Sequence, residues 1–192
     1  MPTRAEIQDI LATSQRQVMA YFQGLSPRDL ERPATANGVP GGAPWRAKDH
    51  LAHLVQNERN IHQHLLRHAL AGETRDDFLR QQYPPGMPLP STLGDWDALT
   101  PEEQKQLELA VASLNQTQLN AHYDDTLEML VADYLAARKD TLELLHQFTD
   151  EQLAAPVPTV VGELAACDLF AGNAGHAVDH MTAIEEGLRP GG

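Results

Sequence analysis

Two histidines near the end of the chain have the spacing of a metal-binding pair. His176 and His180 lie four residues apart in the segment GNAGHAVDHM, residues 172–181. On a helix, residues four apart project from the same face, with their Cβ atoms about 6 Å apart. Two such imidazoles can bind one metal ion, and a third from a neighbouring helix gives a three-nitrogen site that leaves positions open for water or substrate.

A third imidazole is available on a second predicted helix, over residues 46–70. That helix carries His53, which shares a stripe with Asp49 and Asn57. Asp49, and Asp179 beside His180, are close enough in sequence to accept hydrogen bonds from the ring N–H groups of metal ligands. We interpret His62, His64 and His68, which lie on the same helix, as solvent-exposed. A surface helix can also carry such histidine pairs without any metal, and that alternative stays open.

A short internal repeat relates the two halves of the chain. The segment FQGLSPRDLERP, residues 22–33, matches LHQFTDEQLAAP, residues 145–156, at an offset of 123 residues. Each reads as a helix end, a hydroxyl N-cap, a polar turn, a leucine and a proline. Continued without gaps, the offset places His53 on His176. This favours two similar helical hairpins packed about a pseudo-twofold axis near which the two histidines meet, unless the short match is a coincidence.

Helical signals dominate the chain and strand signals are nearly absent. Capping boxes begin helices at Thr3 and Thr100, and apolar residues recur at helical spacing. We predict long helices over 3–25, 46–70, 124–148 and 160–187, with loop at 33–45. The prolines of YPPGMPLP make 72–99 irregular, and a further helix follows over 101–119. The prediction is an all-α single domain, residues 1–192, folded as a four-helix bundle in which a long helix-containing crossover, residues 72–120, joins the second and third helices.

Composition excludes several classes of function. The formal net charge is −13, and the basic residues form no patch, so the sequence argues against nucleic-acid binding. No apolar run approaches the roughly 20 residues that span a bilayer, and no secretion signal is present, so we expect a cytoplasmic protein without a membrane partner. The single cysteine, Cys167, excludes an intramolecular disulfide and any cysteine-cluster metal site.

Four segments resemble the DinB/YfiT-like superfamily of metal-binding proteins. The motif WRAKDHLAHLVQNE, residues 45–58, is similar to its second-helix motif, and GNAGHAVDHMTAI, residues 172–184, is similar to its fourth-helix motif. LSPRDLERP and FTDEQLAAP resemble its inter-helix turns. The resemblance implies a four-helix bundle in an up-down-down-up arrangement, a homodimer, and a divalent metal (Zn, Ni or Fe) held by His53, His176 and His180.

The resemblance also implies the class of activity. Members of the superfamily include thiol-dependent S-transferases and isomerases that use a low-molecular-weight thiol cosubstrate, and hydrolases of small molecules. We therefore expect a metal-dependent enzyme acting on a small molecule, with Asp49, Glu58 and His122 as candidates for proton transfer and no assigned catalytic residue. The alternatives are a non-catalytic bundle that sequesters a small molecule or metal, and an interaction module with incidental histidines. The long 72–120 segment reshapes any pocket, so the substrate is not carried over.

Overall fold

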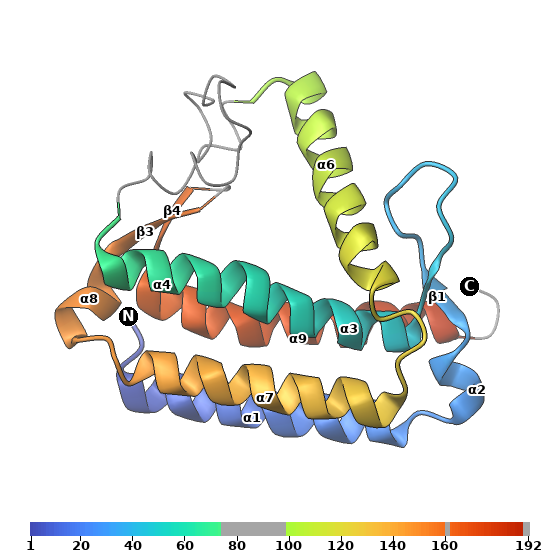
Figure 1. The fold of residues 1–192 in the computed structure, drawn as a ribbon, viewed down its shortest axis with the longest axis horizontal. Coiled ribbons are helices and arrows are strands. Elements are labelled where there is room, and N and C mark those ends of the chain that lie inside the picture. The colour runs from blue at the N-terminus through green and yellow to red at the C-terminus, as the bar shows by residue number, and fades with distance from the viewer. Residues whose placement is uncertain (74–98, 160–161, 190–192) are drawn as a thin grey trace.

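The computed structural model describes residues 1–73, 99–159 and 162–189, and most of these residues are helical (Figure 1). This confirms the predicted helical class. The helices are α1 (Arg4–Gly24), α2 (Pro27–Leu30), α3 (Ala47–Asn57), α4 (Gln63–Ala71), α6 (Pro101–Asn120), α7 (Leu127–Leu145), α8 (Asp150–Ala154) and α9 (Ala166–Leu188). A π-helix, Glu58–His62, joins α3 to α4. No helix within the described ranges has both the length and the apolar content to cross a membrane.

Local sequence explains most helix boundaries. The hydroxyl groups of Thr3 and Thr100 each accept a hydrogen bond from a backbone N–H of the first turn. The backbone N–H of each threonine donates in return to the carboxylate of Glu6 or Glu103, which completes the predicted capping box. Thr149 begins α8 with a capping box of the same kind, and the Ser26 hydroxyl begins α2 by accepting a hydrogen bond from the backbone of Asp29. The second long helix ends at Gly72, whose φ of +71° is a left-handed conformation that glycine adopts without strain. The predicted irregular segment falls almost entirely on 74–98, outside the described residues.

Two small antiparallel hairpins precede α3 and α9. Strand β1 (Pro33–Thr35) pairs with β2 (Trp45–Arg46), and β3 (Pro156–Thr159) pairs with β4 (Gly162–Ala165). The prediction of plain loop over 33–45 and of a helix beginning at 160 was therefore wrong. Strands of two to four residues are too short to show the alternating pattern by which strands are recognised in sequence.

Four long helical segments lie side by side in Figure 1. α1 and α9 run in one direction, whereas α3–α4 and α7 run in the other. α1 contacts both α9 and α7, and α3 contacts both α7 and α9. The apolar core between them divides into one cluster around Phe148 and Phe170 and a second around Trp45, Tyr134 and Ile184.

The element order is repeated in the two halves, as the internal match indicates. Each half has a long helix, a short helix, a two-stranded hairpin and a second long helix. Equivalent backbone bonds close the hairpins: Ala47 donates to the carbonyl of Arg32 at 3.3 Å, and Ala166 donates to that of Ala155 at 3.1 Å. The two halves therefore share one local plan.

The ungapped continuation of the match was nevertheless wrong. Pro33 and Pro156 begin their hairpins at the offset of 123 residues, but the helices that follow begin at Ala47 and Ala166, an offset of 119. The first hairpin is longer by four residues, about one helical turn. His53 therefore does not occupy the position in α3 that His176 occupies in α9, although the two side chains meet.

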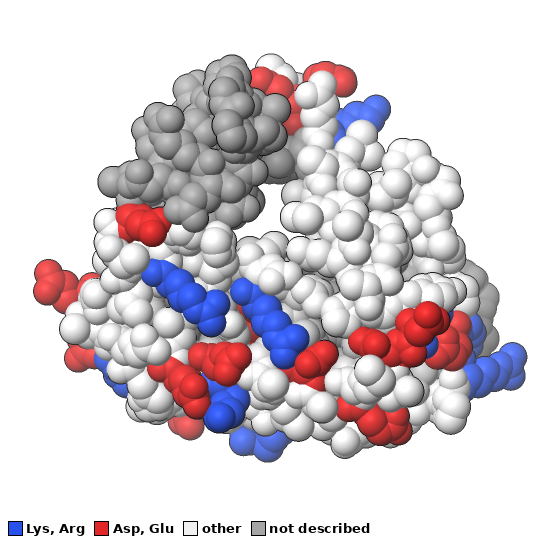
Figure 2. Space-filling view, in the orientation of Figure 1, with Lys and Arg blue, Asp and Glu red and all other residues white. Residues whose placement is uncertain are grey.

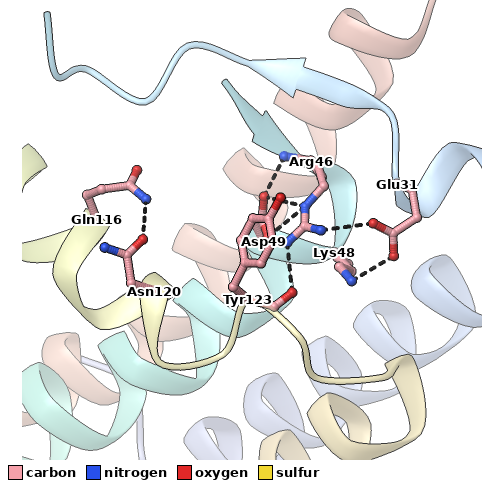
Figure 3. A network of polar contacts seen from close by, with 7 residues as sticks. All are labelled: Glu31, Arg46, Lys48, Asp49, Gln116, Asn120 and Tyr123. Carbon is pink, nitrogen blue, oxygen red and sulfur yellow. Dashed lines mark hydrogen bonds and ion pairs between the residues drawn. The ribbon is translucent and has the colours of Figure 1, made fainter. Parts of the chain in front are cut away.

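The helix α6 stands away from the other helices and is anchored at its C-terminal end (Figure 1). Leu119 is buried there against the core. Beyond it, the Arg46 guanidinium lies 4.1 Å from the Tyr123 ring centroid and donates to the Tyr123 carbonyl at 3.1 Å (Figure 3). Arg46 also pairs with Asp49 at 2.8 Å and with Glu31 at 2.9 Å. This network fixes the end of α6 to the start of α3.

A buried ion pair lies in the middle of the helices. The π-helix places the carboxylate of Glu58 inside, where Oε2 is 3.2 Å from Nη2 of Arg138 and Oε1 accepts a hydrogen bond from Thr141 at 2.6 Å. The same guanidinium nitrogen donates to Oδ1 of Asn173 at 3.1 Å. The side chain of Arg138 is fully buried. Its ion pair with Glu58 links α7 to the π-helix, and its hydrogen bond to Asn173 links α7 to α9.

Candidate metal centre

Three imidazole nitrogens converge between α3 and α9. Nε2 of His176 lies 3.2 Å from Nε2 of His53 and 3.2 Å from Nε2 of His180. Each ring offers a nitrogen within 4.8 Å of the others, so the cluster could hold a metal ion. The structure thus brings together the three residues that the sequence analysis selected.

The spacing of these nitrogens fits a shared ion. Two zinc–imidazole bonds of about 2.0–2.1 Å that meet at a tetrahedral angle place their nitrogens roughly 3.3 Å apart. Burial lowers the pKa of His53 to about 3 and that of His180 to about 2, with further lowering from neighbouring imidazoles. Burial also lowers the pKa of His176. The rings are therefore neutral at pH 7, and neutral imidazole is the form that binds metal.

A fourth histidine, His50, which the sequence analysis did not select, contacts His180 of this cluster. Nδ1 of His50 lies 2.7 Å from Nδ1 of His180, and Nε2 of His50 lies 3.0 Å from Oγ1 of Thr35 on β1. If Nε2 of His180 binds metal, its Nδ1 carries the proton and donates to His50, whose Nε2–H then donates to Thr35. His50 stands three residues before His53, a helical spacing that could have indicated a shared face.

The outer nitrogen of His53 has a different environment. Nδ1 of His53 and Oδ1 of Asn57 are both buried and have no hydrogen-bond partner in the described part of the chain. Asp49, which we expected to accept from a ligand ring, instead accepts hydrogen bonds from the Arg46 backbone at 2.7 Å and from its guanidinium. That expectation was wrong because the carboxylate caps the first turn of α3.

Trp45 packs against the cluster from strand β2. Its ring centroid lies 5.1 Å from that of His53 and 5.3 Å from that of His50, and its ring stacks on His180 at 6.3 Å. The side chain is buried, so it shields one side of the histidines from water. The β1–β2 hairpin therefore covers one side of the histidines, and its first strand also contacts α9.

A cleft of about 700 Å³ opens beside the histidines. Its walls are the β1–β2 hairpin, α9 and one face of α6. The residues of α6 that line it recur at positions i, i+3, i+4 and i+7, and they are Glu108, Val111, Ala112 and Asn115. The hairpin contacts this helix closely, because Nδ2 of Asn37 donates to Oε1 of Gln116 at 3.1 Å. The cleft gives a small molecule access to His176 and His180.

The proposed proton-transfer residues lie elsewhere. Glu58 is bound in the ion pair with Arg138, and Asp49 is bound to Arg46. Nδ1 of His122 donates to Oδ2 of Asp125 at 2.7 Å, and its Nε2 contacts the side-chain amide of Gln56. None of the three is among the described residues that line the cleft. Asp179 does line it, and its charge partly offsets the effect of burial on the pKa of His176.

His62 is not the solvent-exposed residue that we expected. Its Nδ1 is buried without a hydrogen-bond partner among the described residues, and burial lowers its pKa to about 4. The π-helix explains the difference, because it adds one residue to the turn and so rotates the following side chains away from simple helical spacing. His64 and His68 are half-buried and contact each other, with Nε2 atoms 3.1 Å apart.

A second group of possible ligands occurs at the start of α7. His122, Asp125 and Asp133 offer atoms within 4.8 Å of one another. The imidazole is already hydrogen-bonded to Asp125, and Asp133 pairs with Arg59 at 3.2 Å. These partners satisfy the group without an ion, and the three-histidine cluster is the stronger candidate.

Fold and site together define a mostly helical protein with a half-buried three-histidine cluster that could hold a metal ion. No family model matches the sequence, and neither a curated protein nor a solved structure matches it. The functional argument therefore depends on the chemistry of the site itself.

Proposed function

We propose that the protein is a metal-dependent enzyme acting on a small molecule, and that it is a homodimeric member of the DinB/YfiT-like superfamily whose four long helical segments form the characteristic up-down-down-up bundle. The observation that carries the enzymatic proposal is the convergence of the Nε2 atoms of His53, His176 and His180 beside an open cleft. A structural metal would need a fourth protein ligand, whereas three ligands and a cleft suit a site that binds substrate.

The three imidazoles would hold Zn, Ni or Fe, all of which accept nitrogen ligands. When bound, the metal would stabilise a thiolate or lower the pKa of a bound water, which supplies the nucleophile for a thiol-dependent S-transferase or isomerase, or for a hydrolase. His180 would be held in the required tautomer by His50. Trp45 excludes water from one side of the ligands and so strengthens the electrostatic interactions within the site.

The proton released from the thiol or water needs an acceptor that reaches the cleft. Asp49, Glu58 and His122 have other partners, as described above. The acidic side chains among the described lining residues are Asp179 and Glu108. Asp179 is adjacent to His180 in sequence and is the better placed of the two, so we assign it the role of proton acceptor.

The direct test is the metal content of the purified protein. We expect one equivalent of divalent metal per chain in the natural sequence, and loss of that metal in His176→Ala. His146→Ala is a matched control, because His146 lies outside the cluster and contacts Gln8. Absence of metal from the natural protein, or its retention in His176→Ala, would contradict the proposal. Either result would favour the alternative that the protein is an interaction module whose histidines bind no metal.

A second measurement separates an enzyme from a sequestering protein. Metal-loaded protein is mixed with an excess of thiol and an electrophilic small molecule, and product is followed beyond one equivalent. We expect repeated turnover that Asp179→Asn slows. Product or protection that stops at one equivalent per chain would indicate sequestration.

A further inference from the structure

The cleft beside the histidines has mainly apolar walls. Trp45 lines it from the hairpin, Val111 and Ala112 from α6, and Ala183 from α9. The amide of Asn37 also faces the cleft, but its nitrogen already donates to Gln116, and its oxygen accepts from the backbone of Val39 at 2.8 Å. A ligand in the cleft therefore meets hydrocarbon surface over most of its length, and its apolar part is what these walls would bind.

The charged groups of the cleft have a single sign. Glu108 lies on the α6 wall and Asp179 on the α9 wall. None of the described residues that line the cleft is Lys or Arg. His50, His176 and His180 also line it, and an imidazole that binds metal does so in its neutral form. The protein as a whole has a formal net charge of −13, so the surrounding field has the same sign.

A bound divalent metal would be the exception at one end of the cleft. Three neutral imidazoles leave its positive charge uncompensated, so one anionic donor atom is favoured there. A second anionic group further along the ligand would lie between Glu108 and Asp179 with no cation to pair with. Like charges in a partly desolvated cleft repel more strongly than in bulk water.

We infer that the ligand of this cleft is a small molecule with one metal-binding thiol or hydroxyl group and a largely apolar body that is uncharged or positively charged. Thiols that carry carboxylates are disfavoured. The thiol or hydroxyl part of this inference rests on the proposed function, because that group needs a bound metal. The preference for an apolar ligand body that is uncharged or positive depends only on the walls and charges of the cleft.

Three matched thiols test the inference. Benzyl mercaptan is uncharged, 4-(aminomethyl)benzyl mercaptan is positively charged, and 4-(mercaptomethyl)benzoate is negatively charged, yet all share one aromatic body. Each is titrated into cobalt-loaded protein, where a thiolate–cobalt absorption band reports binding. Each is also titrated into metal-free Trp96→Phe protein, in which Trp45 is the remaining tryptophan of the two and its fluorescence reports occupancy of the cleft.

We expect the uncharged and positive thiols to bind at least tenfold more tightly than the negative one at low ionic strength. Added salt should reduce the difference in affinity between these thiols, because it screens Glu108 and Asp179. Glu108→Gln should reduce the difference as well, and Glu108→Lys should make the negative thiol the tighter ligand. Glu108 is exposed on α6, so both variants should fold.

The outcomes distinguish this inference from the metal proposal. Equal or tighter binding of the negative thiol, in either form of the protein, overturns the inference. Failure of all three thiols to bind in either form also overturns it. If the protein takes up no cobalt, the metal proposal fails, but the fluorescence ranking in metal-free protein still supports or overturns the preference of the cleft.

Discussion

Nδ1 of His50 lies 2.7 Å from Nδ1 of His180, and this contact determines which nitrogen of His180 faces the other ligands. Two ring nitrogens at hydrogen-bond distance share one proton, so one donates and the other accepts. The remaining nitrogen of His180 then points at His176, 3.2 Å away. His50 is therefore a positioning residue for His180, through which it would act on a metal bound by the three histidines.

Replacement of His50 should weaken metal binding without removing any ligand. We expect His50→Leu to lower zinc affinity by about 10- to 100-fold, the usual effect of losing such a partner. Asn places an amide oxygen near the position of Nδ1, so His50→Asn should retain most of the affinity, whereas His50→Gln should not. Competition with a chromogenic chelator measures the affinity, and equal affinities for His50→Leu and the natural protein would exclude the role.

Removal of metal should lower thermal stability, because the folded state alone presents the three nitrogens together. Free metal at 100 times its dissociation constant adds about 2.7 kcal/mol, or roughly 5–10 °C in melting temperature for a chain of this size. Differential scanning fluorimetry with and without EDTA measures the shift. The same chelator should leave the melting temperature of His53→Ala unchanged, and an equal shift in both proteins would indicate that the metal binds elsewhere.

The buried ion pair should be sensitive to loss of one partner. Arg138→Met leaves the carboxylate of Glu58 buried without its cation, which typically destabilises by about 3–5 kcal/mol. The double variant Glu58→Gln with Arg138→Met removes both charges and should recover part of that loss. Urea unfolding measures both. Additive losses in the double variant would show that the two side chains do not interact.

Acid should destabilise the metal-free protein through His62. Burial lowers the pKa of His62 from 6.5 to about 4 in the folded state, so the unfolded chain binds more protons between these values. The stabilising contribution is complete above pH 6.5 and is lost as the pH falls towards 4, by up to about 3 kcal/mol. Urea unfolding between pH 7.5 and 4.5 should show a flatter profile for His62→Leu, and parallel profiles would contradict the assignment.

The long helices and the pairing of His176 with His180 could be predicted because their signals are local and regular. Capping boxes mark helix starts within four residues, and the spacing of His176 and His180 is a property of one helix. The contact of His50 with His180 could not be predicted from local spacing, because the two residues are 130 positions apart in the sequence. The same holds for the ion pair between Glu58 and Arg138, which requires the packing of two helices around a π-helix.

The errors of prediction also have physical causes. Asp49 shares a helix face with His53, but its carboxylate pairs with Arg46 instead. Spacing alone therefore predicted the wrong partner for Asp49. His62 was interpreted as exposed from regular helical spacing, and the π-helix breaks that regularity. The β1–β2 hairpin was missed because its strands are very short, although it supplies Trp45 and Thr35 to the site.

The β1–β2 hairpin is four residues longer than the β3–β4 hairpin, and this difference affects only one end of the long helices. The β1–β2 and β3–β4 hairpins occupy opposite ends of the long helices (Figure 1). On the face shown in Figure 2, Lys and Arg are interspersed with Asp and Glu along the long helices. The longer hairpin contributes residues 35–38 to the cleft, and none of the described residues of the shorter hairpin lines it. A change in the length of the β1–β2 loop would therefore reshape the cleft at one end of the long helices without altering the β3–β4 hairpin at the other end.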